Sequence, residues 1–254
     1  MSVIEKSMKD IGVNGLVCLE AGTGAGNMTR YLVKNGAKLV YSISNNEEHL
    51  EYARKRLSDK EAERVKFIKA DLCNLSIIPS ETVDLVTAHM LINVVPPTEI
   101  LLIFRELTRV TKINGLIVIN DYNPLSSYMG KRSYLVEELF KIENALNYLI
   151  ESKPALVWYP AEYIIQLLKL LGWVLEDMEL VYKKTPWEKD LLKEHVEVIE
   201  GLCTKVNNER IKNTFLQQTL EIFNKVKDDE VIYAGSIYSV RMQKKLDKML
   251  KKTK

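Results

Sequence analysis

Cysteine is scarce in this sequence, and the few cysteines do not form a recognisable set. The 254 residues include three, Cys18, Cys73 and Cys203. Their number is odd, their spacings are wide, and none belongs to a Cys-x-x-Cys pair. Disulfide frameworks and zinc sites both depend on cysteines in paired spacings. We therefore expect neither a disulfide nor a bound metal.

Long hydrophobic runs are also missing. No stretch of 18 apolar residues occurs, so the sequence contains no candidate transmembrane helix. The first residues, MSVIEKSMKD, lack the apolar centre of a secretory signal peptide. These two absences predict a cytoplasmic protein with no membrane partner.

An excess of positive charge is missing as well. The 36 basic and 34 acidic residues leave a formal net charge of +2. Proteins that bind DNA or RNA backbones usually carry a larger basic excess or a basic stripe. The basic run Lys244–Lys254 is typical of a solvated helix end. The composition therefore argues against a nucleic-acid partner, while 46% hydrophobic residues suffice for a sizeable core.

The first half of the chain alternates short apolar runs with helical patterns. The expected strands are Leu16–Glu20, Lys38–Ser44, Val65–Ala70, Val83–Ala88 and Leu116–Asn120. Helices are expected from about Ala25 to Lys34, from Asn45 with Glu48 completing a capping box, and from Thr98 to Thr111, closed by Asn114-Gly115. Apolar strands between helices indicate a parallel sheet that is covered on both faces.

The alternation stops after Tyr122, and two insertions interrupt the remaining core elements. Residues 123–159 and Trp187–Lys227 are expected to be helical, Ala161–Leu171 a helix, and Trp173–Tyr182 and Val231–Arg241 strands. The predicted division is a core (1–123), a helical insertion (124–159), a core helix and strand (160–183), a second helical insertion (184–228), and a last strand with a basic tail (229–254). We expect the insertions to form one cap over the carboxyl edge of the sheet, where ligands bind in doubly wound folds.

The most informative stretch surrounds the end of the first expected strand. Glu20 is followed by Gly22, Gly24 and Gly26 at alternate positions. Glycine permits positive φ and leaves no Cβ in the way of a ligand, and the next helix directs its free N–H groups to the same turn. Dinucleotide-binding turns of the form GxGxxG have glycine where this chain has Asn27. The pattern therefore favours a nucleotide-like ligand other than NAD.

The stretch Glu20-Ala21-Gly22-Thr23-Gly24-Ala25-Gly26 resembles motif I of the class I S-adenosylmethionine-dependent methyltransferases. Further landmarks extend the resemblance over roughly residues 10–122. It implies a doubly wound, mostly parallel α/β sheet of seven strands, completed by an antiparallel hairpin of Trp173–Tyr182 and Val231–Arg241. It also implies S-adenosylmethionine as the cofactor and S-adenosylhomocysteine as the product.

The resemblance assigns cofactor contacts to individual positions. Glu20 matches the acid that lies near the methionine moiety, and the turn that approaches the cofactor comprises Ala21, Gly22, Thr23, Gly24 and Gly26. Asp71 and Leu72 match the pair that contacts the adenine. Ala88 and His89 match the exit of the fourth strand, which lines the methionine end of the cofactor and the acceptor site.

One position departs from the family's pattern. At the end of the second strand the family usually has Asp or Glu, which accepts hydrogen bonds from both ribose hydroxyls, but this chain has Ser44. Exchanging a charge-assisted hydrogen bond for a neutral one costs about 1 kcal/mol. Asn45 is a second candidate for the same contact. The departure keeps a non-catalytic cofactor-binding protein among the alternatives.

Three residues are candidates for catalytic work near the acceptor. His89 is a candidate general base, and the alternative is a histidine that binds backbone or faces solvent. Asp121 and Tyr122 follow the fifth strand and either contact an acceptor or form an ordinary turn. His49 is expected at the surface, and His195 is a weaker candidate for substrate contact.

These observations favour methyl transfer to a small-molecule acceptor held under the helical cap. A tRNA or protein methyltransferase is the first alternative, and a regulatory protein that binds S-adenosylmethionine without catalysis is the second. The expected partners are the small-molecule acceptor and, as an open option, a second copy of the chain in a homodimer.

Overall fold

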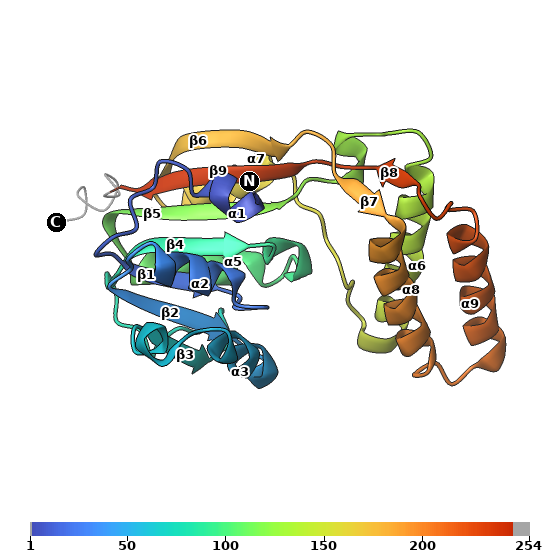
Figure 1. Cartoon of the computed structure of the whole chain (residues 1–254), viewed down its shortest axis with the longest axis horizontal. Coiled ribbons are helices and arrows are strands. Elements are labelled where there is room, and N and C mark those ends of the chain that lie inside the picture. The colour runs from blue at the N-terminus through green and yellow to red at the C-terminus, as the bar shows by residue number, and fades with distance from the viewer. Residues whose placement is uncertain (1, 246–254) are drawn as a thin grey trace.

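The computed structural model describes residues 2–245 of the chain. Its largest element is a seven-stranded sheet with the strand order β3-β2-β1-β4-β5-β9-β6 (Figure 1). These strands are β1 (Val17–Ala21), β2 (Leu39–Ser44), β3 (Val65–Lys69), β4 (Val83–His89), β5 (Thr111–Tyr122), β6 (Trp173–Tyr182) and β9 (Ile237–Lys244). β1 to β5 are parallel, and β9 lies antiparallel between β5 and β6. The predicted mostly parallel sheet with its antiparallel hairpin is confirmed.

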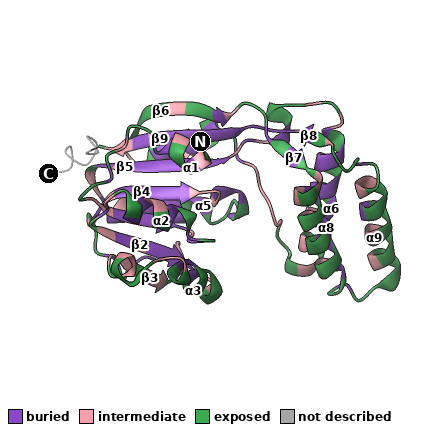
Figure 2. Ribbon diagram, viewed as in Figure 1, coloured by how far each residue is buried: buried purple, intermediate pink, exposed green. Residues whose placement is uncertain are grey.

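Helices cover both faces of this sheet. They are α1 (Val3–Ser7), α2 (Asn27–Lys34), α3 (Glu47–Lys55), α4 (Asp59–Ala62), α5 (Ile100–Val110) and α7 (Ala161–Leu170), with short 3-10 helices η1 (Ile92–Val94) and η2 (Leu125–Ser127). The central strands of the sheet are largely buried (Figure 2). Successive residues of a strand point to opposite faces of the sheet. In β1, Cys18 packs with the α1 and α2 side chains, and Leu19 with those of α5 and α7.

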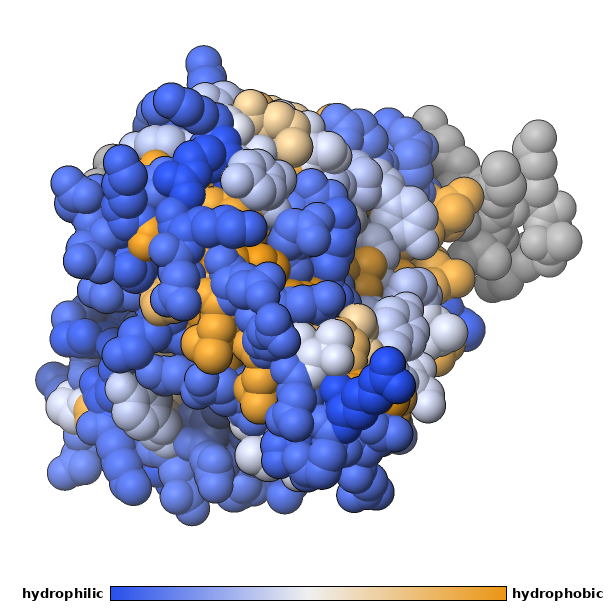
Figure 3. Space-filling model, turned by 90° about the vertical axis from the view of Figure 1, so that its right-hand side faces the viewer, coloured by the Kyte–Doolittle hydropathy of each residue, from blue (hydrophilic) through white to orange (hydrophobic). Residues whose placement is uncertain are grey.

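A second lobe holds α6 (Tyr134–Glu151), α8 (Lys189–Cys203), α9 (Glu209–Phe223) and a two-stranded sheet of β7 (Pro186–Glu188) and β8 (Val231–Tyr233). It has its own apolar core, in which Leu139 and Leu146 of α6 pack with Ile199 of α8. The lobe lies beyond the carboxyl ends of β1, β2 and β4 (Figure 1). Its outward side is mostly hydrophilic, with a hydrophobic patch near the middle of the view (Figure 3).

The last expected strand, Val231–Arg241, is wrong as a single element. It is divided into β8, which pairs with β7 in the lobe, and β9, which enters the main sheet. Gly235 lies between them with φ +70 and donates its N–H to the carbonyl of Leu125 at 3.0 Å. A turn with positive φ redirects the chain, so the apolar pattern continues while the strand does not.

Three helix boundaries also differ from expectation. Asn46, not Asn45, is the N-cap of α3, and its side chain accepts from the N–H of Glu48 at 2.9 Å without the expected capping box. α5 ends at Val110 and β5 begins at once, so Asn114-Gly115 does not close that helix. α2 begins at Asn27, two residues after the expected start.

The insertions are less uniformly helical than expected. Within residues 123–159 the one α-helix is α6, and Trp187 lies in strand β7. The region Trp187–Lys227 contains two helices, since Asn208 starts α9 by accepting from the N–H of Ile211 at 3.1 Å.

Two expectations concern the whole chain. Within residues 2–245, no helix combines the length and apolarity that a membrane crossing requires. The expected helix end Lys244–Lys254 falls largely outside the described residues, which include only Lys244 and Lys245 of it.

Candidate active site

A cavity of about 300 Å³ lies at the carboxyl ends of β1 to β4. The residues that line it come from the glycine turn (Gly22 and Gly24), the end of β2 (Ile43, Ser44 and Asn45), the end of β3 (Ala70, Asp71 and Leu72) and the exit of β4 (His89, Met90 and Leu91). The cavity therefore collects four segments that the sequence identified separately, because parallel strands bring their carboxyl ends to one edge.

The three glycines of the turn all have positive φ, but their surroundings differ. A Cβ on Gly26 would lie 2.5 Å from the Cβ of Ala53, and one on Gly22 would lie 2.7 Å from Cδ1 of Leu91. A Cβ on Gly24 would meet nothing within 4 Å, and Gly24 lines the cavity. Gly22 and Gly26 thus permit close packing of the protein on itself. Gly24 leaves open the space that a ligand backbone would occupy.

Glu20 lies beneath this turn rather than in the cavity. Its side chain is buried, and its carboxylate accepts hydrogen bonds from the hydroxyls of Thr29 and Ser42, the latter at 2.9 Å. Thr23 of the turn is joined to the same Ser42 hydroxyl at 2.8 Å. Burial raises the pKa of Glu20 to about 7, although these hydrogen bonds act in the opposite direction. The network ties the turn to β1, β2 and α2, and Ala21 beside it is fully buried.

The end of β2 presents polar groups to the cavity. Ser44 is nearly buried, and its hydroxyl oxygen accepts from the N–H of Asn46 at 3.1 Å. Because this bond uses an acceptor lone pair, the Ser44 hydroxyl proton is free to reach a ligand. Asn45 is exposed and lines the cavity. His49, which sequence reasoning assigned to the surface, is exposed and also lines the cavity, because α3 begins immediately after β2.

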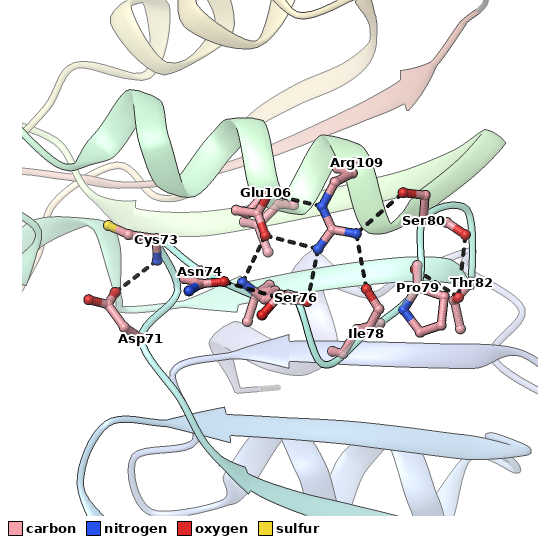
Figure 4. A network of polar contacts seen from close by, with 12 residues as sticks. Asp71, Cys73, Asn74, Ser76, Ile78, Pro79, Ser80, Thr82, Glu106 and Arg109 are labelled. Carbon is pink, nitrogen blue, oxygen red and sulfur yellow. Dashed lines mark hydrogen bonds and ion pairs between the residues drawn. The ribbon is translucent and has the colours of Figure 1, made fainter.

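The loop after β3 is held by an ion pair on α5. Arg109 and Glu106 lie 2.9 Å apart, and both bind the backbone of Leu75, the guanidinium at its carbonyl and the carboxylate at its N–H, each at 2.8 Å. Figure 4 shows this pair beside the loop. At the loop's start Asp71 accepts from the N–H of Cys73 at 2.8 Å. The ion pair thereby fixes the segment that carries Asp71 to the cavity.

At the exit of β4, His89 is joined to the neighbouring strand. Its Nδ1 contacts Oδ1 of Asn120, which is fully buried, and the two residues are in register between β4 and β5. Burial lowers the pKa of His89, and the hydrogen bond with Asn120 only partly opposes that effect. The next residue, Met90, has φ +49, which turns the chain sharply after His89. The imidazole is therefore held neutral near pH 7 at the cavity wall.

Asp121 and Tyr122, which were expected to follow the fifth strand, are its last two residues, and Asp121 does not line the cavity. It is 1% exposed, and its carboxylate accepts from the N–H groups of Ile92 and Asn93, at 2.6 and 3.1 Å, and of Tyr122. Burial raises its pKa to about 7. These bonds anchor the loop that follows β4. The geometry favours the turn interpretation over direct contact with an acceptor, and Asp121 as a catalytic residue stays a prediction.

Tyr122 and Ala88 also lie away from the cavity. The ring of Tyr122 stacks on that of Trp187, with centroids 5.9 Å apart, and so faces the lobe. Ala88 is fully buried against the apolar side chains of the sheet. His195 is likewise in the lobe, where its Nδ1 lies 2.9 Å from a carboxylate oxygen of Glu143.

Sequence reasoning missed the apolar wall of the cavity. This wall consists of Leu91, Val94, Val95, Pro96 and Ile103. Leu91–Pro96 belongs to the connection between β4, which ends at His89, and α5, which begins at Ile100. An apolar run between a strand and a helix is a usable signal, because a loop that only met water would need no such side chains.

The cavity fits the cofactor that the resemblance implies. One side is apolar, the glycine turn leaves room at Gly24, and polar groups converge from Ser44, Asn45 and Asp71. An adenine ring needs apolar walls and a few directed polar contacts, and ribose hydroxyls need oxygen or amide partners. These residues would hold the adenosine part of S-adenosylmethionine, with His89 and Met90 at the other end of the cavity.

Comparison with known proteins also indicates a methyltransferase. Residues 19–119 match the family model described as Methyltransferase domain. No curated protein matches the sequence. The three solved structures described next are 13–16% identical to the chain, so their likeness establishes the fold alone.

Three such structures span nearly the whole chain. The YcgJ protein of Bacillus subtilis has a TM-score of 0.63 and 15% identity, covering 96% of this chain and 99% of its own. An S-adenosylmethionine-dependent methyltransferase of Mesorhizobium loti has a TM-score of 0.57 and 16% identity, covering 95% of both chains. Geranyl diphosphate C-methyltransferase of Streptomyces coelicolor has a TM-score of 0.59 and 13% identity, covering 95% of this chain and 77% of its own. The domain match shows that residues 19–119 form a methyltransferase domain, and the sheet topology and the cavity agree with the class I fold and with S-adenosylmethionine as its cofactor.

Proposed function

We propose that the enzyme methylates a small molecule whose acceptor atom lies beside His89. The observation that carries this proposal is the position of His89, which ends β4 and lines the cofactor cavity. One solved neighbour, the Streptomyces coelicolor enzyme, is named for a small molecule, geranyl diphosphate. That name supports a small-molecule acceptor for this chain.

His89 would act as the general base for an acceptor that must lose a proton. When bound, the cofactor supplies an electrophilic methyl group on a sulfonium ion. An amide oxygen only accepts hydrogen bonds, so the contact of Asn120 Oδ1 with Nδ1 assigns the imidazole proton to Nδ1. Nε2 is then an unprotonated acceptor, as proton removal requires. Asp121 would act indirectly by holding the loop after β4.

The lobe would serve as the cap over the acceptor, as residues 124–159 and 184–228 were expected to do. It lies beyond the carboxyl ends of the strands (Figure 1). The segment that joins α6 to α7 also reaches the β4 loop, since Val157 donates its N–H to the carbonyl of Asn93 at 2.7 Å. A movement of the lobe would thereby be transmitted to the cavity wall.

A methyl-transfer screen tests this function. S-adenosylmethionine with a tritiated methyl group is incubated with the enzyme and a cell extract that has been separated by size. We expect label in the small-molecule fraction, and less label with His89→Gln if the acceptor is a hydroxyl. Label confined to the protein or RNA fractions would favour the first alternative. A cofactor-binding protein that labels no fraction would overturn the proposal in favour of the regulatory alternative.

A further inference from the structure

A second cavity, of about 490 Å³, adjoins the cofactor cavity. α1 contacts β5 and β6, and α2 contacts β1 and β2, so β4 lies beneath the groove between the two helices (Figure 1). The groove ends at His89 and Met90, which line both cavities. We call it the α1–α2 groove; Val3, Ile4 and Glu5 line it on the α1 side, and Arg30, Tyr31 and Lys34 line it on the α2 side.

Because the groove and the cofactor cavity share a boundary, a ligand in the groove is placed to accept the methyl group. Methyl transfer requires the acceptor atom to lie next to the methyl donor. A ligand in the α1–α2 groove that reaches His89 is next to a ligand in the cofactor cavity, because one side chain borders both. Among the described residues, none from the lobe lines either cavity. The contacts to the acceptor would therefore come from α1, α2 and the β4 exit, and not from the lobe.

Positively charged side chains outnumber negatively charged ones along the groove. Arg30 and Lys34 lie on α2, both are exposed, and neither forms an ion pair with any residue in 2–245. Among residues 2–245, Glu5 is the one carboxylate that lines the groove, and it already accepts from the N–H of Ser2 at 2.7 Å in a capping box. The groove thus offers two cations that are in no ion pair, although Glu61 lies near enough to both for their charges to lower its pKa. Such a pair suits a carboxylate or phosphate.

The remaining walls are apolar. Val3 and Ile4 lie on the α1 side, and the ring of Tyr31 lies on the α2 side. Ile4 belongs to the apolar cluster of this face, and Tyr31 packs against it. A ligand that fills the groove therefore has an apolar body between its charged end and the end at His89.

We propose that the α1–α2 groove is the acceptor site and that its acceptor is an organic anion. Arg30 and Lys34 bind the carboxylate or phosphate, the apolar walls hold the body, and the nucleophilic atom lies at His89. This inference rests on the proposed function and adds the chemical class of the substrate to it.

Phenyl phosphate is a suitable probe, with phenol as its neutral match. The enzyme is saturated with S-adenosylhomocysteine, and each probe is titrated while the imidazole signals of His89 and the amide signal of Met90 are followed by NMR. We expect saturable shifts with phenyl phosphate and at least about tenfold weaker binding of phenol, because charge-assisted bonds are lost. Phenyl phosphate that leaves His89 unshifted would overturn the proposal.

A double variant tests the two cations. Arg30→Gln with Lys34→Gln should weaken phenyl phosphate binding about tenfold or more and leave folding intact, since both side chains are exposed. Lys193→Gln with Lys205→Gln on the lobe is the matched control, because it removes the same charge at exposed positions. Equal affinity of the groove variant and the control would overturn the proposal.

The carboxylate of the cofactor itself is the competing source of the anion. S-adenosylhomocysteine has this carboxylate and 5′-methylthioadenosine lacks it. If the groove variant weakens the first ligand and not the second, the two cations hold the cofactor and the acceptor assignment is wrong. We expect both ligands to bind the variant as they bind the wild type. All these readouts are binding constants, so they stay independent of the methyl-transfer screen.

Discussion

At the scale of single residues, the three glycines of the turn separate ligand binding from folding. Gly24 faces open space in the cavity, whereas Gly26 faces the Cβ of Ala53 at 2.5 Å. Gly24→Val should therefore abolish binding of S-adenosylhomocysteine while the protein stays folded, with a cost of about 1–3 kcal/mol for a side chain at positive φ. Isothermal titration calorimetry measures the binding, and thermal unfolding measures the fold.

Gly26→Val is the control for that prediction. It should lower the unfolding temperature further than Gly24→Val, since its side chain adds overpacking of about 1–3 kcal/mol against α3. Near-normal ligand affinity in a folded Gly24→Val protein would show that the turn is not the cofactor site.

Ser44 offers a second residue-scale test. Ser44→Asp should tighten S-adenosylhomocysteine binding about fivefold, because a carboxylate accepts from both ribose hydroxyls and gains about 1 kcal/mol over a neutral hydroxyl. The second carboxylate oxygen can still accept the hydrogen bond from the N–H of Asn46, which the Ser44 hydroxyl accepts in the wild type. The dissociation constant is measured at fixed salt and pH. An unchanged constant would mean that another group holds the ribose.

His89 should be neutral with its proton on Nδ1. NMR of protein labelled with ¹⁵N-histidine reads the tautomer directly, and the chain has only three histidines. Because burial puts the folded pKa of His89 below the unfolded value of 6.5, its contribution to stability is complete above pH 6.5 and is lost as the pH falls. Asn120→Asp should raise the pKa of His89 by placing a carboxylate beside it.

Asn120→Leu completes the His89 series. It removes the acceptor of the Nδ1 proton, so the tautomer preference should weaken while the buried volume is kept. A wild-type protein with its proton on Nε2, or a tautomer that is the same in Asn120→Leu, would contradict the role assigned to Asn120.

The acids of the site show what the sequence alone could not specify. Glu20 and Asp121 both stand at strand ends, and a strand end fixes the edge of the sheet but not the direction of the side chain. Glu20 meets the hydroxyl of Ser42 from β2, and Asp121 meets backbone N–H groups of the loop after β4. Those partners are distant in sequence, so only the fold brings them together.

At the scale of secondary-structure elements, two neighbouring asparagines at the start of α3 have different roles, one in capping the helix and one at the cavity. Asn46 caps the helix, and the neighbouring Asn45 is exposed at the cavity. Asn46→Ala should lower the free energy of unfolding by about 1 kcal/mol. Asn45→Ala should leave that free energy within about 0.5 kcal/mol and weaken S-adenosylhomocysteine binding. Urea unfolding and calorimetry measure the two effects, and an exchange of these outcomes would restore Asn45 as the cap.

The central strands were predictable because burial on both faces demands continuous apolar runs, as in β1 and β4. The glycine turn was predictable because Glu20 stands two residues ahead of its first glycine, directly after an apolar strand. The break between β8 and β9 was not, since Gly235 changes the chain direction without interrupting the apolar pattern. The cavity wall at Leu91–Pro96 was missed for a related reason, because a loop has no periodicity to reveal which side chains face inward.

At the scale of the whole molecule, the two lobes should differ in local stability. The strands β1, β4 and β5 lie at the centre of the sheet, while α8 and α9 have one exposed side (Figure 2). Amide hydrogens of α6, α8 and α9 should therefore exchange faster than those of the central strands, and cofactor with acceptor should slow them. Hydrogen exchange read by mass spectrometry measures both rates. Lobe helices as protected as β4 before ligand is added would argue against an opening cap.

The place of β9 has a consequence for how the chain is made. β9 comes last among the strands, yet it lies between β5 and β6, and in the described residues β6 pairs with no other strand. β7 depends in the same way on β8, which immediately precedes β9. As the ribosome releases the chain, the five parallel strands have all their partners early, while β6 and β7 emerge with unpaired backbone. Both lobes close only when residues 231–244 appear, so a chaperone that shields open strand edges would act on this protein during that interval.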